Sequence, residues 1–161
     1  MQLDNFSTLD IVRIMSISYY YGAHFNSANS DIYTHDFYNY TEPFLRSFLI
    51  SSDYCEEPLK EVPSLDKSLF MKYVYANIPL SKTINDALLN VVSKADYNQT
   101  PALVMIIIKH CIWEYLNNDK VALARLISQY MMIARVFLGV VYLNMINAVL
   151  IHVINSLNES E

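Results

Sequence analysis

The most hydrophobic stretch of the chain lies in residues 100–116, TPALVMIIIKHCIWEYL, where Leu103 to Ile108 are six consecutive apolar positions. Successive residues of a helix are about 100° apart, so six in a row cover every side of it. Such a helix must be surrounded by protein or by lipid. Thr100 is suited to cap it, and Pro101 to occupy its first position, where the missing N–H is harmless. The pattern predicts a central, buried helix.

Amphipathic patterns on both sides of this segment predict six further helices. Their apolar residues recur every three or four positions, so each helix presents one apolar face. Two of them begin at capping boxes of the form S/T-x-x-D, one at Ser7 and one at Thr83, and Gly22 and Gly139 are expected to end helices. The six helices are predicted over residues 8–22, 42–51, 64–77, 83–94, 121–138 and 140–157.

The remaining segments are predicted as connections. Residues 23–41 are predicted as an Asn- and Ser-rich loop, with a short strand as the alternative. Residues 53–62 are an acidic linker, and residues 95–99 the turn into the central helix. A chain of 161 residues is long enough to bury one core without disulfides. We therefore expect an all-α fold, in which residues 1–161 form a single-domain helical bundle of about seven helices around a central hydrophobic helix.

Composition and charge exclude several classes of protein. An apolar fraction of 53% with 17% charged residues excludes a disordered chain. The net charge of −5 argues against nucleic acid as a partner, since phosphate binding draws on clustered Lys and Arg. Residues 1–62 hold nine acidic and three basic residues, so a partner of this part should not be acidic.

Residues 131–154 are long and apolar enough to span a membrane. Arg135 near the middle of such a span would cost roughly 2.5–3.5 kcal/mol, and Asn144, Asn147 and His152 would add to that. We therefore expect a soluble helical core. Because the last predicted helix has only a narrow polar stripe, it is either mostly buried or part of a homodimer interface.

The candidates for chemistry are few. His110 and Cys111 are adjacent and so point about 100° apart on a helix, which excludes a nucleophile–base pair. His110 and Glu114 are four residues apart and could share a face, but a core histidine satisfied by a neighbouring side chain is the preferred interpretation. Met131, Met132 and Met145 recur at helical spacing and are interpreted as core filler in preference to the lining of a promiscuous groove.

His24 and His35, with Asp31 and Asp36, would offer a metal site only if their loop folded back, and a polar loop is the preferred interpretation. Two cysteines make neither a disulfide framework nor a metal site, which fits an intracellular protein. We expect no catalytic residue, no metal, no cofactor and no enzymatic activity.

The helix count and the stretch KADYNQTPALVMIIIKHCIWEYLNND together carry a resemblance. This stretch resembles the Bcl-2 fold, with a polar turn, a long apolar helix fifth in order and an aromatic near its end, here Trp113. More narrowly, the chain resembles the divergent Bcl-2-like proteins of poxviruses, which are also rich in Asn, Ile and Tyr. The resemblance implies a viral protein that acts by binding host proteins in the host cytoplasm.

Two binding modes follow from the resemblance. One is a groove that captures a pro-apoptotic amphipathic helix, and the other is a surface that blocks an innate-immune signalling adaptor. Ala102 stands where the family has an Arg, and no apolar anchor follows Leu157, so inhibition of signalling is favoured over inhibition of apoptosis. The alternative is a helical structural or membrane-associated subunit. The groove is predicted to be lined by Phe44, Phe48, Phe70, Tyr73, Leu88, Val92 and Val104.

Overall fold

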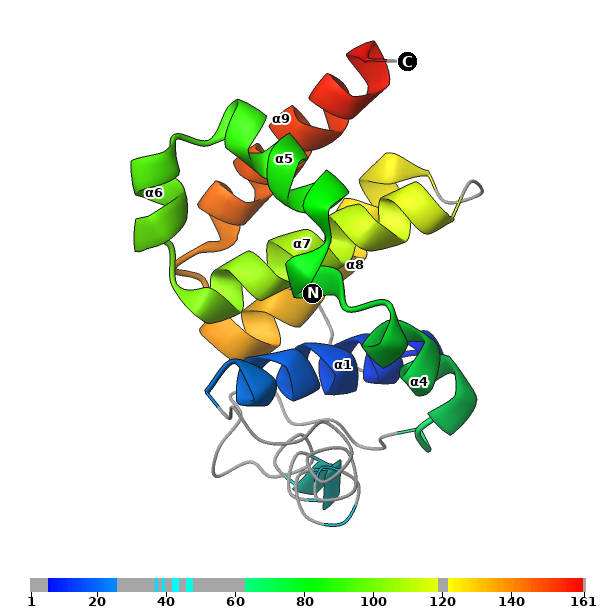
Figure 1. Cartoon of the computed structure of the whole chain (residues 1–161). Helices are drawn as coiled ribbons and strands as arrows, with labels where there is room; N and C mark the ends of the chain where they lie inside the picture. Colours follow the sequence, from blue (N-terminus) through cyan, green and yellow to red (C-terminus); the bar gives the residue numbers. More distant parts are fainter. Residues whose placement is uncertain are drawn as a thin grey trace. The chain divides into compact units, whose positions relative to one another are not determined.

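The computed structural model describes residues 6–25, 37, 39, 42–43, 46–47, 63–118 and 122–160. Every regular element in these ranges is helical, which confirms the all-α prediction with seven α-helices and one 3₁₀ helix (Figure 1). The elements are α1 (Thr8–Phe25), α4 (Lys67–Tyr75), η2 (Ile78–Leu80), α5 (Lys82–Val91), α6 (Lys94–Gln99), α7 (Ala102–Asn117), α8 (Leu123–Leu138) and α9 (Leu143–Glu159).

The chain divides into two compact units, Met1–Tyr75 and Ala76–Glu161. The first unit contains α1 and α4, and the second contains η2 and α5 to α9. The predicted loop over residues 23–41, the helix over 42–51 and the acidic linker lie largely outside the described residues. The prediction of a single domain stays a prediction.

The first unit begins at the predicted capping box. The Ser7 backbone N–H donates to the Asp10 carboxylate at 2.9 Å, and the Asp10 N–H donates back to the Ser7 hydroxyl at 3.2 Å. Asp10 also pairs at 2.8 Å with the guanidinium of Arg13, whose side chain is 1% exposed. The prediction that Gly22 ends this helix is wrong, because α1 continues to Phe25.

Aromatic side chains join α1 to α4. Tyr19 meets both Phe37 and Phe70 edge to face, and these two rings stack at 5.4 Å between centroids. The Tyr20 hydroxyl donates to the Tyr73 carbonyl and, at 3.1 Å, to the carbonyl of Val74. These polar contacts explain why the Tyr20 hydroxyl can be buried in an apolar cluster.

The second unit is built around α7, as predicted. All nine residues from Val104 to Ile112 are buried, and α7 contacts η2, α5, α8 and α9 (Figure 1). Neighbours on every side explain why this helix lacks a polar face. The central hydrophobic helix is therefore confirmed.

The entry into α7 differs from the prediction. Pro101 is the N-cap and not the first helical residue, while Thr100 ends the preceding helix, its hydroxyl donating to the Asp96 carbonyl at 2.7 Å. The predicted turn is the short helix α6, whose N-cap Ser93 accepts from the Asp96 N–H at 3.1 Å. The capping box at Thr83 is also wrong, because α5 begins one residue earlier, at Lys82.

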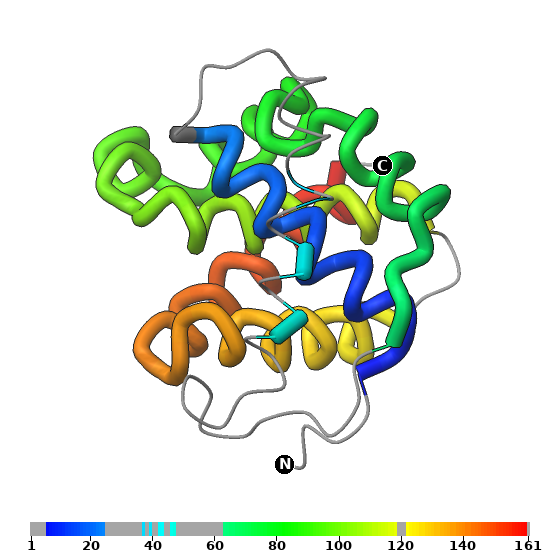
Figure 2. Tube along the Cα trace, turned by 90° about the horizontal axis from the view of Figure 1, so that it is seen from below, coloured from blue at the N-terminus to red at the C-terminus, as the bar shows by residue number. Residues whose placement is uncertain are grey.

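The predicted break at Gly139 is confirmed. It separates α8 from α9, two helices in contact that lie side by side in Figure 2. Gly139 has φ 62° and ψ −142°, a backbone conformation that side chains with a Cβ rarely adopt. No helix in the described part of the chain is long and apolar enough to cross a membrane.

Replacing Gly139 by Ala should lower the free energy of unfolding by about 1–2 kcal/mol, measured by urea titration. No atom lies within 4 Å of the added Cβ, so the cost comes from the backbone alone. Gly22, inside α1, is the matched control, because Ala there should raise helix propensity by about 0.5–1 kcal/mol. Equal effects of the two substitutions would contradict this account.

Candidate functional site

The residues predicted to line a groove fall into three groups. Phe44 and Phe48 lie outside the residues whose side chains are described. In the first unit, Phe70 and Tyr73 are buried. The others, Leu88, Val92 and Val104, belong to the second unit, where Leu88 and Val104 are fully buried and only Val92 is half-buried. That all seven line one groove stays a prediction.

Val92 does line a groove, which we call the α5–α9 groove. It has a volume of about 580 Å³, within the roughly 300–1,000 Å³ typical of binding pockets. It opens where the end of α5, the short helix α6, the start of α7 and the start of α9 meet. Its apolar and aromatic lining residues are Val91, Val92, Pro101, Met105, Ile108, Tyr142, Met145 and Val149.

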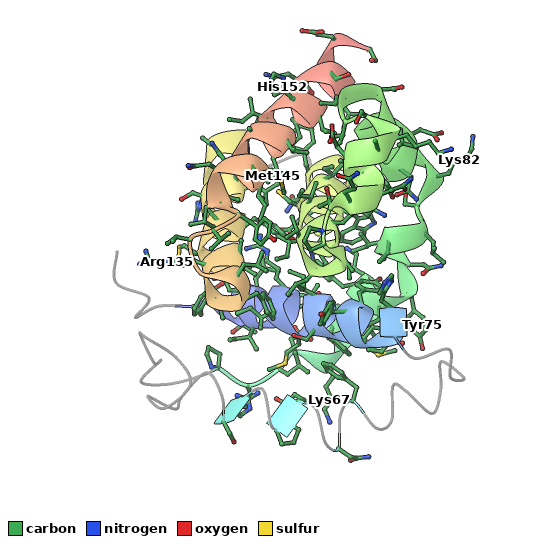
Figure 3. The ribbon with its side chains drawn as sticks, turned by 90° about the vertical axis from the view of Figure 1, so that its left-hand side faces the viewer. Lys67, Tyr75, Lys82, Arg135, Met145 and His152 are labelled. Carbon is green, nitrogen blue, oxygen red and sulfur yellow. The ribbon has the colours of Figure 1, made fainter. Side chains whose placement is uncertain are left out.

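Two methionines shape this groove. Met105 on α7 is 8% exposed and Met145 on α9 is 36% exposed. Figure 3 shows Met145 on the side of α9 that faces α7. The interpretation of Met145 as core filler is therefore wrong. Because methionine side chains are unbranched and flexible, they can adapt to differently shaped apolar groups.

Asp96 carries the single formal charge among the residues that line the α5–α9 groove. It is exposed, and its carboxylate accepts from the Ser93 hydroxyl at 2.6 Å. That bond fixes the carboxylate at the rim while leaving it open to solvent. The groove thus offers apolar contacts to a ligand and one negative charge at its edge.

The buried ionisable residues of α7 have partners within the second unit. Lys109 donates to the Pro79 carbonyl at 3.2 Å, and its Nζ lies 5.2 Å from the centre of the Tyr97 ring. The Tyr130 hydroxyl of α8 lies 2.6 Å from His110 Nδ1 and donates to Glu114 Oε2 at 2.7 Å. Lys109, His110 and Glu114 therefore all have hydrogen-bond partners in the core.

The Tyr130 hydroxyl links two side chains of α7. It donates to Glu114 and lies within hydrogen-bond distance of Nδ1 of His110, so one hydroxyl serves both groups. His110, Tyr130 and Glu114 are 0%, 0% and 3% exposed. The preferred interpretation of His110 as a core histidine satisfied by a neighbour is confirmed.

The structure does not bring the other candidate residues from the sequence together into a site within the described part of the chain. His24 is exposed at the end of α1, while His35, Asp31 and Asp36 lie outside the described residues. Where side chains are described, no three potential ligands gather into a metal site. Cys111 is buried on α7 and forms no disulfide.

A comparison of the chain with known proteins found no relative. The chain matches no protein-family model, no curated protein and no solved structure. The resemblance to the Bcl-2-like proteins stays a prediction.

Proposed function

We propose that this chain is a non-enzymatic protein that binds a partner protein through the α5–α9 groove. In this proposal it is a viral protein acting in the host cytoplasm, where it inhibits innate-immune signalling or, as the second branch, apoptosis. The observation that carries the binding role is the groove itself, a hollow of about 580 Å³ with an apolar lining and one carboxylate at its rim.

The chemistry of the groove suggests an amphipathic helix as its ligand. Such a helix presents apolar side chains at positions i, i+3 or i+4, and i+7, which can enter a groove together. Met105 and Met145 would contact these side chains, and Asp96 would pair with a Lys or Arg beside them. Rim charges of this kind select partners and speed association more than they add affinity.

Replacing Met145 by Gln tests the apolar contacts. Gln has a similar length and helix propensity but carries an amide, so binding of an amphipathic helical peptide should weaken about tenfold, since burying a methionine is worth roughly 1.5–3 kcal/mol. The measurement is fluorescence anisotropy with labelled helices, among them pro-apoptotic ones. Unchanged affinity in Met145→Gln would contradict the assignment of the groove.

Leu89→Gln is the matched control, because Leu89 is 44% exposed on α5 and does not line the groove. Its affinity for the peptides should equal that of the wild type. If none of the pro-apoptotic peptides binds, inhibition of apoptosis is excluded.

The rim charge is tested by Asp96→Asn, which keeps a side chain able to bond Ser93. It should weaken peptides that carry a Lys or Arg beside their apolar stripe by about two- to fivefold, the size of an exposed ion pair. The same peptides with Gln at that position should bind both proteins equally. An equal loss for both peptide sets would show that Asp96 acts through the fold of α6 and not through its charge.

A further inference from the structure

One wall of the α5–α9 groove is the short helix α6, which lies between the end of α5 and the start of α7 (Figure 1). Asp96 and Gln99 of α6 line the groove, together with Ser93 and Thr100 at its two ends. All residues of α6 are described, and none is buried, whereas α5, α7 and α9 each bury several. A segment with few buried contacts opens locally at a low free energy. This wall is therefore the most easily opened part of the groove.

Two pairs of residues with an extended backbone bound α6. Val92 and Ser93 before it have ψ angles of 134° and 150°, and Thr100 and Pro101 after it have ψ angles of 131° and 140°. A few residues at the ends of an element, which absorb changes in φ and ψ, are the usual hinges of protein segments. α6 can therefore turn as one piece while α5 and α7 keep their own helical hydrogen bonds.

Tyr97 holds α6 against the rest of the unit through a closed ring of contacts. Its hydroxyl donates to Asn85 Oδ1 of α5 at 3.2 Å, and the Asn85 amide donates to the Pro79 carbonyl at 3.4 Å. The same carbonyl accepts from Lys109 Nζ of α7 at 3.2 Å, and this ammonium lies 5.2 Å from the centre of the Tyr97 ring. We call these four residues the Tyr97 latch.

We propose that α6 is a hinged wall of the α5–α9 groove and that the Tyr97 latch sets how often this wall opens. The latch consists of part-buried polar contacts, each of which adds little net stability. Tyr97 does not line the groove, so it acts on a ligand only through the position of α6. An open α6 admits the apolar stripe of a helix, and a closed α6 retains it. The opening is a property of the fold, whereas this gating role rests on the proposed function.

Hydrogen exchange of the full chain, followed by NMR, tests the opening without any ligand. The Tyr97 and Thr100 amides, which donate to carbonyls at 2.8 Å and 3.0 Å, should be at least about a hundredfold less protected than the buried amides of α7. Tyr97→Phe removes the bond to Asn85 and keeps the ring beside Lys109. It should lower the protection of α6 about three- to tenfold and leave that of α7 unchanged.

Tyr97→Ala removes the ring as well, so it should lower the protection of α6 further, by about ten- to a hundredfold. Alanine is a better helix former than tyrosine, so helix propensity cannot cause this loss. Asn98→Ala is the matched control, because Asn98 is exposed on α6 and lies outside the latch. Its α6 amides should be protected at least as well as in the wild type. Wild-type α6 amides as protected as those of α7, or no faster exchange in Tyr97→Ala, would overturn the proposal.

The gating role is measured by stopped-flow fluorescence with a labelled amphipathic helical peptide that carries a Lys beside its apolar stripe. If α6 must open for the peptide to enter and to leave, Tyr97→Phe should raise the association and dissociation rates alike, about three- to tenfold, with the affinity within about twofold of the wild type. Loss of a contact would raise the dissociation rate alone, and that result would overturn the gating role. If no peptide binds the wild type, the proposed function and the gating role both fail, and the exchange rates still decide whether α6 opens.

Discussion

Replacing Tyr130 by Phe is expected to lower the free energy of unfolding by about 2–4 kcal/mol, because it removes two hydrogen bonds of a buried cluster at once. The hydroxyl is within 2.6 Å of His110 and 2.7 Å of Glu114, and Tyr130 is fully buried. Phe has nearly the same shape, so no cavity forms. Urea unfolding followed by circular dichroism measures the effect.

Tyr115→Phe supplies the matched control for this loss. Its hydroxyl also donates to a side chain of another helix, Asn158 at 2.8 Å, but this bond is exposed to water. Removing it should change the stability by no more than about 0.5 kcal/mol. Losses of the same size for both variants would show that burial of the cluster is not what makes Tyr130 important.

This cluster shows what the sequence can and cannot predict about the core. Helical spacing correctly placed His110 and Glu114 on one face and favoured a structural role for the histidine. Their shared partner, Tyr130, comes from a different helix, and no local pattern links it to them. Contacts between helices depend on how the helices pack, and that information is absent from periodicity.

Helix starts show a similar limit. The sequence contains three S/T-x-x-D boxes: Ser7 and Ser93 do cap helices, whereas Thr83 lies inside α5. The box at Ser93 is followed by six residues without an apolar stripe, so periodicity does not predict the helix that it caps. A capping motif indicates where a helix can begin but does not fix its first residue. In α5 the helix begins at Lys82, with Ser81 as its N-cap.

The α5–α9 groove was only partly foreseeable. The periodic pattern identified α8, the break at Gly139 and α9, but it could not decide which side of α9 remains open. Helical spacing with Met131 and Met132 favoured a core position for Met145. Its half-open position on α9 depends on how α5, α6 and α7 pack against that helix, which periodicity does not contain.

Replacing Asp10 by Ala in the first unit is expected to lower the free energy of unfolding by about 3–5 kcal/mol. The substitution removes the carboxylate that pairs at 2.8 Å with Arg13, a guanidinium only 1% exposed, and it also removes the acceptor for the N–H of Ser7. A buried guanidinium that loses a carboxylate partner is costly, whereas the pair itself adds little. The loss should again be measured by urea titration.

Two comparisons separate the buried charge from the loss of the helix cap. Asp86→Ala breaks an exposed pair with Lys82, 3.5 Å apart, and should cost at most about 1 kcal/mol. Adding Arg13→Met to Asp10→Ala removes the guanidinium that has lost its bond to Asp10 and should restore most of the lost stability, because apolar replacements of a buried ion pair are often neutral. The remaining deficit, about 0.5–2 kcal/mol, would be the contribution of the cap. A double variant no more stable than Asp10→Ala would mean that Arg13 contributes through its packing and not through its charge.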